Sequence, residues 1–288
     1  MCPTEVGHEA HGGHRARRVL VFLSVDVHTP RTLDEALRLK AELPEARFLQ
    51  GGTDVMVELN FGRSRPDALV NLAELADLRG WSRDDGELRL GAGLTYTEAM
   101  RPELADVFPA LAEASRTVGS PQIRNRGTIG GNLGTASPAG DALPPLLAER
   151  ARVEIASTRG VRTLPLEEFL LSVKRSALEP DELVTSVRLR PSGGAQTFMK
   201  VGPRNAMVIA ICSLAVVVDA DAGEVRASFG SAATTAKQVT VPLADAASLP
   251  ERIADAASPI DDVRATAAYR RHALRVLAGR ALERCLRS

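Results

Sequence analysis

Apolar residues recur on one face in several stretches of the chain, as they do in amphipathic helices. Between Leu33 and Leu43 this pattern follows Thr32, a possible N-cap, and predicts one such helix. Two further helical segments are predicted around 96–105 and 110–118. In the final stretch, Asp262–Leu286, arginines stand between apolar residues and predict a C-terminal helix.

Short apolar runs bounded by glycine, proline or aspartate predict strands in both halves of the chain. The predicted strands are Ala46–Leu49, Arg152–Ala156, Gly160–Leu164, 182–190, Ile209–Asp219 and Glu224–Gly230. The second and third of these form a predicted hairpin, as do the last two. Helices and strands follow one another without a regular βαβ repeat, so the predicted fold class is α+β.

The length of 288 residues fits about two domains at roughly 150 residues each. We expect an N-terminal extension over 1–24, a first domain over 25–175 and a second domain over 176–288. The extension carries three spaced histidines that could chelate a metal if a helix formed. They are His8, His11 and His14. Neighbouring glycines make that helix costly, so a polar tail is the preferred interpretation.

Charge and composition exclude several classes of protein. Lys plus Arg and Asp plus Glu are both 36, and aromatic residues are 3%, so no nucleic-acid surface is expected. The longest apolar run, Val208–Val218, is too short to span a membrane. Cys2, Cys212 and Cys285 are too few and too scattered for an iron–sulfur cluster or a disulfide framework. Because a signal peptide is not recognisable, we expect a cytoplasmic protein.

The first candidate binding segment is Phe48–Val55, where an apolar strand enters Gly51-Gly52 and leaves through Thr53. Glycines permit positive φ and let successive backbone N–H groups point into one concavity. Such a concavity binds an anion, commonly a phosphate. Taken alone, a Gly-Gly pair after a strand is more often only a tight turn.

A second segment of the same chemistry begins at Thr128, with Gly130-Gly131 followed by Asn132. A plain turn is again the alternative. Two such segments could hold the two phosphates of a dinucleotide from opposite sides. Neither contains G-x-G-x-x-G, and neither is followed by Lys and Ser or Thr, so neither is a Rossmann fingerprint or a P-loop.

Two further polar residues stand beside proline and glycine in the sequence. Asp141 could accept hydrogen bonds from ribityl or ribose hydroxyls, or it could cap a helix that starts at Ala142. Lys200 is one of only four lysines in the chain and lies in an apolar stretch that precedes Gly202-Pro203. A solvated strand edge is the alternative for Lys200.

Taken in order with Ser137-Pro138, Asp141 and Lys200–Arg204, the two glycine segments resemble the FAD-binding subunit of the molybdenum hydroxylases. This family contains the FAD subunit of bacterial xanthine dehydrogenase and the medium subunit of carbon monoxide dehydrogenase. The resemblance extends from about Val27 to Leu286. It implies an FAD-binding domain of the p-cresol methylhydroxylase/vanillyl-alcohol-oxidase type, then a C-terminal antiparallel sheet with a helical bundle, and FAD between them.

The resemblance also implies which residues contact the cofactor. The first segment would wrap the diphosphate, the second would close on it, Asp141 would bind a hydroxyl and Lys200 would stand near the flavin. The implied set is Phe48, Leu49, Gln50, Gly51, Gly52, Thr53, Asp54, Val55, Thr128, Ile129, Gly130, Gly131, Asn132, Asp141 and Lys200, with Val118 and Val184 as apolar flavin contacts. Gln50 departs from the family pattern, in which many members carry a small residue before Gly-Gly.

The activity implied by the resemblance is that of an FAD-dependent, xanthine dehydrogenase-like electron-transfer subunit. A two-cluster [2Fe-2S] subunit would deliver electrons, NAD⁺ or another acceptor would receive them, and a molybdenum-cofactor subunit would oxidise the substrate. The expected assembly is a dimer of heterotrimers. No metal ligand or catalytic residue is expected in this chain itself. Two alternatives stay open, a stand-alone flavin-dependent oxidase and a non-catalytic nucleotide-binding module.

Overall fold

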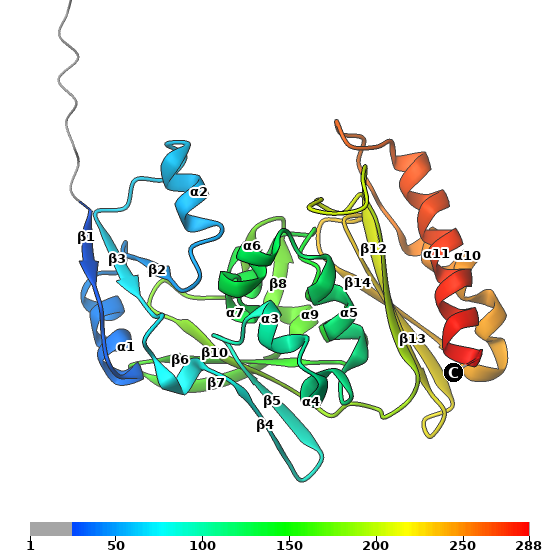
Figure 1. Cartoon of the computed structure of the whole chain (residues 1–288), viewed down its shortest axis with the longest axis horizontal. Coiled ribbons are helices and arrows are strands. Elements are labelled where there is room, and N and C mark those ends of the chain that lie inside the picture. Colours follow the sequence, from blue (N-terminus) through cyan, green and yellow to red (C-terminus); the bar gives the residue numbers. More distant parts are fainter. Residues whose placement is uncertain (1–24, 288) are drawn as a thin grey trace, which may run out of the picture.

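The computed structural model describes residues 25–287, and its first sheet is a small parallel one (Figure 1). The sheet contains β1 (Asp26–His28), β3 (Ala68–Asn71) and β2 (Arg47–Leu49), in that order. Helix α1 (Leu33–Glu42) joins β1 to β2, and α2 (Val55–Asn60) follows β2. Thr32 caps α1 by accepting a hydrogen bond from the N–H of Glu35 at 3.2 Å. The predicted helix and the predicted strand of this region are therefore confirmed.

The second sheet is antiparallel and forms the floor of the central part of the molecule (Figure 1). Its strands are β4 (Trp81–Asp84), β5 (Glu87–Gly91), β10 (Leu183–Leu189), β6 (Arg152–Ser157) and β7 (Gly160–Pro165), in spatial order. The predicted β6–β7 hairpin is confirmed. Strand β10 pairs with both β5 and β6, although it follows the boundary expected at residue 175. We propose that the division between the two parts of the chain follows β10.

Short helices cover this second sheet, and three of them begin at a proline, whose fixed φ suits the first turn. They are η1 (Ala76–Leu78), α3 (Tyr96–Ala99), α4 (Pro102–Ala105), α5 (Pro109–Thr117), α6 (Pro121–Arg126), α7 (Ile129–Thr135), α8 (Leu143–Ala148) and α9 (Leu166–Phe169), with the ribbon β8 (Leu170–Ser172) and β9 (Arg175–Ser176). The helical segment predicted around 96–105 is divided into two helices, because Pro102 starts a new one.

The third sheet is antiparallel and lies between two helical layers (Figure 1). It contains β11 (Gln196–Val201), β12 (Cys212–Asp219), β13 (Glu224–Gly230) and β14 (Lys237–Pro242), and is followed by η2 (Leu243–Ser248), α10 (Leu249–Ala256) and α11 (Ala267–Arg287). One face packs on α10 and α11, and the other packs on α5 and α8. The β12–β13 hairpin was predicted, whereas β11 and β14 were not. The mixture of helices and sheets is confirmed.

The C-terminal helix begins later than predicted. The expected start was Asp262, but α11 starts at Ala267. The carboxylate of Asp262 accepts hydrogen bonds from the backbone N–H groups of Arg264 and Ala265, at 2.8 and 3.2 Å. Its ion pairs with the guanidinium groups of Arg264 and Arg270 hold 261–266 as a loop. The hydrogen bonds from Arg264 keep the pKa of Asp262 well below its usual range.

None of the helices found within 25–287 is both long and apolar enough to cross a lipid bilayer. The three histidines of the N-terminal extension lie outside the described residues.

Candidate functional site

A cavity of about 610 Å³ opens between the first sheet, α7 and the edge of the second sheet. Its size is within the usual range for small-molecule sites. Every described residue in its wall lies between Arg47 and Val184. The third sheet contributes none of the lining residues, and the part of the chain expected after residue 175 contributes Leu178, Glu182, Leu183 and Val184.

The loop from Gly51 to Val55 forms one wall of this cavity. Gly52 has a φ of +77°, a conformation that glycine adopts without strain. The carbonyl oxygens of Gly52 and Asp54 accept hydrogen bonds from the first amides inside α2, at 3.0 Å each. Among the residues that the structure describes, no acceptor is found for the backbone N–H groups of 51–55. This part of the cavity wall therefore contains a run of backbone donors that are free to bind an anion.

The second glycine segment is the start of helix α7, not the open loop that was expected. The N–H groups of Ile129 and Gly130 donate to carbonyl oxygens in the chain that follows β5, at 2.9 and 2.8 Å. The N–H of Gly131 donates to Oγ1 of Thr128 at 3.0 Å. These donors are thus already bonded within the protein, and the segment forms a rigid wall opposite the first loop.

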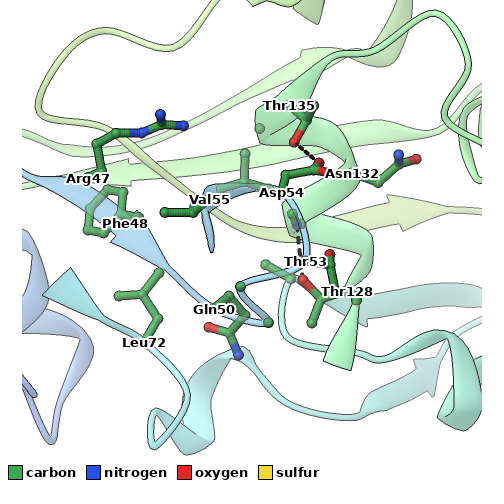
Figure 2. Close-up of a pocket in the computed structure, with 18 of the residues that line it drawn as sticks. Arg47, Phe48, Gln50, Thr53, Asp54, Val55, Leu72, Thr128, Asn132 and Thr135 are labelled. Carbon is green, nitrogen blue, oxygen red and sulfur yellow. Dashed lines mark hydrogen bonds between the residues drawn. The ribbon is translucent and has the colours of Figure 1, made fainter. Parts of the chain in front are cut away.

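Two contacts join the walls, and Figure 2 shows one of them. Oγ1 of Thr135 in α7 donates to Oδ2 of Asp54 at 2.6 Å (Figure 2). At the other end of the loop, Gly51 lies against the backbone at the end of α6. A Cβ atom at Gly51 would stand 1.8 Å from the carbonyl oxygen of Arg126. A residue without a side chain is therefore required at this position.

Most residues of the predicted set line the cavity. They are Phe48, Gln50, Gly51, Gly52, Thr53, Asp54, Val55, Val118, Thr128, Gly130, Gly131, Asn132 and Val184. Four predicted residues do not reach the wall. Leu49 lies in β2, Ile129 is fully buried in the core, and Asp141 and Lys200 lie behind the wall.

Asp141 and Lys200 form a buried ion pair, with 2.5 Å between Oδ2 and Nζ. Lys200 also donates to the carbonyl oxygen of Thr117 at 3.2 Å, next to Val118 of the wall. Burial raises the pKa of Asp141, and the ammonium group of Lys200 opposes this shift. Asp141 is not a helix cap, because Ala142 is the N-cap of α8 and has no side-chain cap bond. Lys200 is buried and does not occupy a solvated strand edge.

Several wall residues were not predicted. Tyr96 is held by a capping box, in which Thr95 and Glu98 exchange hydrogen bonds at the start of α3. The sequence signal T-x-x-E after an apolar strand could have found that helix start. At the rim, Glu58 pairs with Arg47 at 2.5 Å and with Lys174 at 3.6 Å. The apolar part of the wall also contains residues outside the predicted set, namely Leu72, Leu78, Ile123, Leu178 and Leu183.

The wall fits a dinucleotide that carries a diphosphate and hydroxyl groups. The free N–H groups of 51–55 are donors of the kind that phosphate oxygens accept. Gln50 and Asn132 also belong to the wall, and their side-chain oxygens are buried and have no partner within the described chain. The apolar leucines suit the aromatic rings of such a ligand.

Comparisons with known proteins identify the class to which this fold and site belong. The family model described as "FAD binding domain in molybdopterin dehydrogenase" matches residues 23–191. The chain is 35% identical over 224 residues to the xanthine dehydrogenase FAD-binding subunit of Escherichia coli O157:H7, covering 75% of this chain and 76% of that protein. It is 37% identical over 205 residues to the nicotinate dehydrogenase FAD-subunit of Eubacterium barkeri, covering 67% and 69%.

A solved structure of carbon monoxide dehydrogenase from Oligotropha carboxidovorans has the same fold, with a TM-score of 0.83. Its identity to this chain is 26%, and the match covers 91% of this chain and 97% of that one. The chain belongs to the family of FAD-binding domains of molybdopterin dehydrogenases. It is an FAD-binding oxidoreductase subunit of the molybdenum hydroxylase type.

Proposed function

We propose that this chain passes electrons through FAD in a xanthine dehydrogenase-like molybdenum hydroxylase. Electrons arrive from [2Fe-2S] clusters of a partner subunit and leave to NAD⁺ or another acceptor. The observation that carries this proposal is the cavity between two glycine segments, one of which presents free N–H groups. The names of the relatives, which are FAD subunits of dehydrogenases, support the same reaction class.

Each wall has a separate task in this proposal. The N–H groups of 51–55 bind the diphosphate, because free amides at a helix start favour anions. The hydrogen bond between Asp54 and Thr135 keeps the two walls at a fixed distance. The leucines exclude water from the rings. Bound FAD supplies a group that accepts electrons singly or in pairs.

The buried pair of Asp141 and Lys200 does not line the cavity, but it holds a backbone segment next to the wall. Nζ of Lys200 fixes the carbonyl oxygen of Thr117 and, through it, the neighbouring Val118. The pair is therefore assigned a positioning role in place of the hydroxyl and flavin contacts that the resemblance implies. A lysine without its aspartate would be a buried unpaired charge, which is strongly unfavourable.

The remaining parts of the proposal concern the fold and the assembly. The part of the chain up to β10 is proposed to be an FAD-binding domain of the p-cresol methylhydroxylase/vanillyl-alcohol-oxidase type. The rest, with its antiparallel sheet and terminal helices, is the C-terminal domain of the family. Partner subunits carry the molybdenum cofactor and the [2Fe-2S] clusters, in a dimer of heterotrimers in the cytoplasm.

Purification of the full chain, alone and from its native cell extract, tests the proposal. A yellow protein that oxidises NADH with artificial acceptors, and that comes out of the extract with molybdenum and iron, is expected. Turnover of an alcohol or aldehyde by the chain alone would favour a stand-alone oxidase. A colourless chain that binds another nucleotide would favour a nucleotide-binding module, and either result would overturn the proposal.

A further inference from the structure

Tyr96 is a cavity-wall residue that the predicted set did not include. Its side chain is 5% exposed, and no hydrogen bond of its hydroxyl is found among residues 25–287. Its backbone N–H donates to the carbonyl oxygen of Gly127 at 3.2 Å. A Cβ atom at Gly127 would lie 3.2 Å from two carbons of the tyrosine ring, so the ring packs on this glycine. Tyr96 therefore lies against Gly127, the residue that precedes the N-cap of α7.

The surroundings keep this phenol neutral. Burial raises the pKa of Tyr96, and the nearby carboxylates of Asp141 and Asp54 raise it further. A neutral phenol retains its proton and can donate a hydrogen bond to an anion. Its oxygen is not one of the fully buried side-chain atoms that lack a partner, so a ligand in the cavity that Tyr96 lines can accept from it.

The position of Tyr96 matters because the two walls differ in their free donors. The first loop offers the N–H groups of 51–55, whereas the first amides of α7 are already bonded within the protein. A diphosphate between the walls would therefore meet few backbone donors on the α7 side. The ring of Tyr96 packs on Gly127, next to the start of α7, and its hydroxyl is an unused donor in the cavity wall.

We propose that the hydroxyl of Tyr96 donates a hydrogen bond to the diphosphate of the bound dinucleotide. Tyr96 is thus a further cofactor-binding residue. On the α7 side it supplies a donor in place of the backbone N–H groups that are already bonded within the protein. This inference rests on the proposed function, because the dinucleotide is the FAD of that proposal.

The substitution Tyr96→Phe removes the hydroxyl and keeps the ring on Gly127. Hydrogen bonds to charged groups contribute enough that FAD and ADP should both bind about 10- to 100-fold more weakly. The reduction potential of bound FAD should not change, because the flavin ring is not contacted. Tyr269→Phe is the matched control, since Tyr269 is the only other tyrosine, lies in α11 and is 48% exposed. It should leave both affinities at the wild-type value.

Unchanged affinity for FAD and ADP in Tyr96→Phe would overturn the inference. A shifted potential with unchanged ADP affinity would also overturn it, because the phenol would then contact the flavin. If Tyr96→Phe does not fold, the wild-type chain labelled with ¹³C at the tyrosine Cζ gives a second test. The Tyr96 signal, assigned with Tyr269→Phe, should shift when ADP is added, and a fixed signal would refute the contact. A wild-type chain that binds neither nucleotide would instead refute the proposed function.

Discussion

The loop 51–55 and the segment 128–132 have nearly the same composition, yet they contribute differently to the cavity. The N–H groups of the first have no acceptor in the described chain, while those at the start of α7 donate to the chain after β5 and to Thr128. The first segment is therefore suited to bind an anion. The second is suited to form a rigid surface opposite it.

The glycines of the two segments are needed for different reasons. Gly52 adopts a φ of +77°, which few other residues accept. Gly130 has no positive φ, but a Cβ there would stand 2.6 Å from the Cβ of Ala92. A Gly-Gly pair in a sequence can thus indicate either a strained turn or a close approach of two backbones.

The largest effect is expected from Gly51→Ala. The new Cβ would clash with the carbonyl oxygen of Arg126, and overpacking of this kind costs about 1–3 kcal/mol or more. Because the clash separates the two walls, the affinity for FAD should fall by about 100-fold, measured by fluorescence titration of the apoprotein. Gly279→Ala in α11 is the control, since its Cβ meets nothing within 4 Å and this residue does not line the cavity. That variant should keep its FAD affinity and gain about 0.5–1 kcal/mol of stability. Equal FAD affinity in Gly51→Ala and the wild type would show that the close approach of Gly51 to Arg126 is not needed to keep the two walls together.

Local signals predicted much of the fold. The cap at Thr32 identified α1, and the turn between Asp219 and Glu224 identified the β12–β13 hairpin. The start of α11 was wrong, because the apolar spacing continues through a loop that the carboxylate of Asp262 holds. Strands β11 and β14 were missed because their pairing with β12 and β13 is not visible in their own residues.

The candidate site was predictable in composition but not in hydrogen bonding. The sequence placed both glycine segments, and the structure brings them to one cavity. The backbone N–H groups at the start of α7 are not free, because they donate to the carbonyl oxygens of Leu94 and Ala92. These two residues lie more than thirty positions earlier in the chain, so the local sequence does not reveal the bonds. The partner of Lys200 is Asp141, and no local pattern links these two residues.

A smaller effect is expected where the walls are joined. The hydrogen bond from Thr135 to Asp54 is 2.6 Å long and lies at the surface, so its coupling energy should be about 0.5–1.5 kcal/mol. A double-mutant cycle with Asp54→Ala and Thr135→Val, measured on FAD affinity, tests this value. The control cycle uses Thr97→Val and Asn125→Ala, because this exposed pair has the same 2.6 Å bond outside the cavity. Coupling in FAD affinity at the control pair, or none at Asp54 and Thr135, would show that the walls are joined elsewhere.

The smallest effect is expected at the rim, where Glu58 ties α2 to the rest of the first wall. The hydrogen bond from Arg47, together with Lys174, lowers the pKa of Glu58 below its ordinary value of 4.5. Because the folded-state pKa is the lower one, the stabilisation is complete above the unfolded-state value of 4.5. It is lost as the pH falls through the folded-state pKa.

Glu58→Gln should therefore reduce stability by no more than about 1 kcal/mol at pH 7, because the pair is partly exposed, and the difference from the wild type should disappear in acid. Chemical denaturation at several pH values measures it. Glu283→Gln, which breaks an exposed pair with Arg287 on α11, is the control. Only Glu58→Gln should also speed the release of FAD, since α2 has no buried residue of its own and depends on such contacts. Equal rates of FAD release in the two variants would mean that the first wall is as rigid as α7. The two walls would then differ only in whether their backbone amides are free.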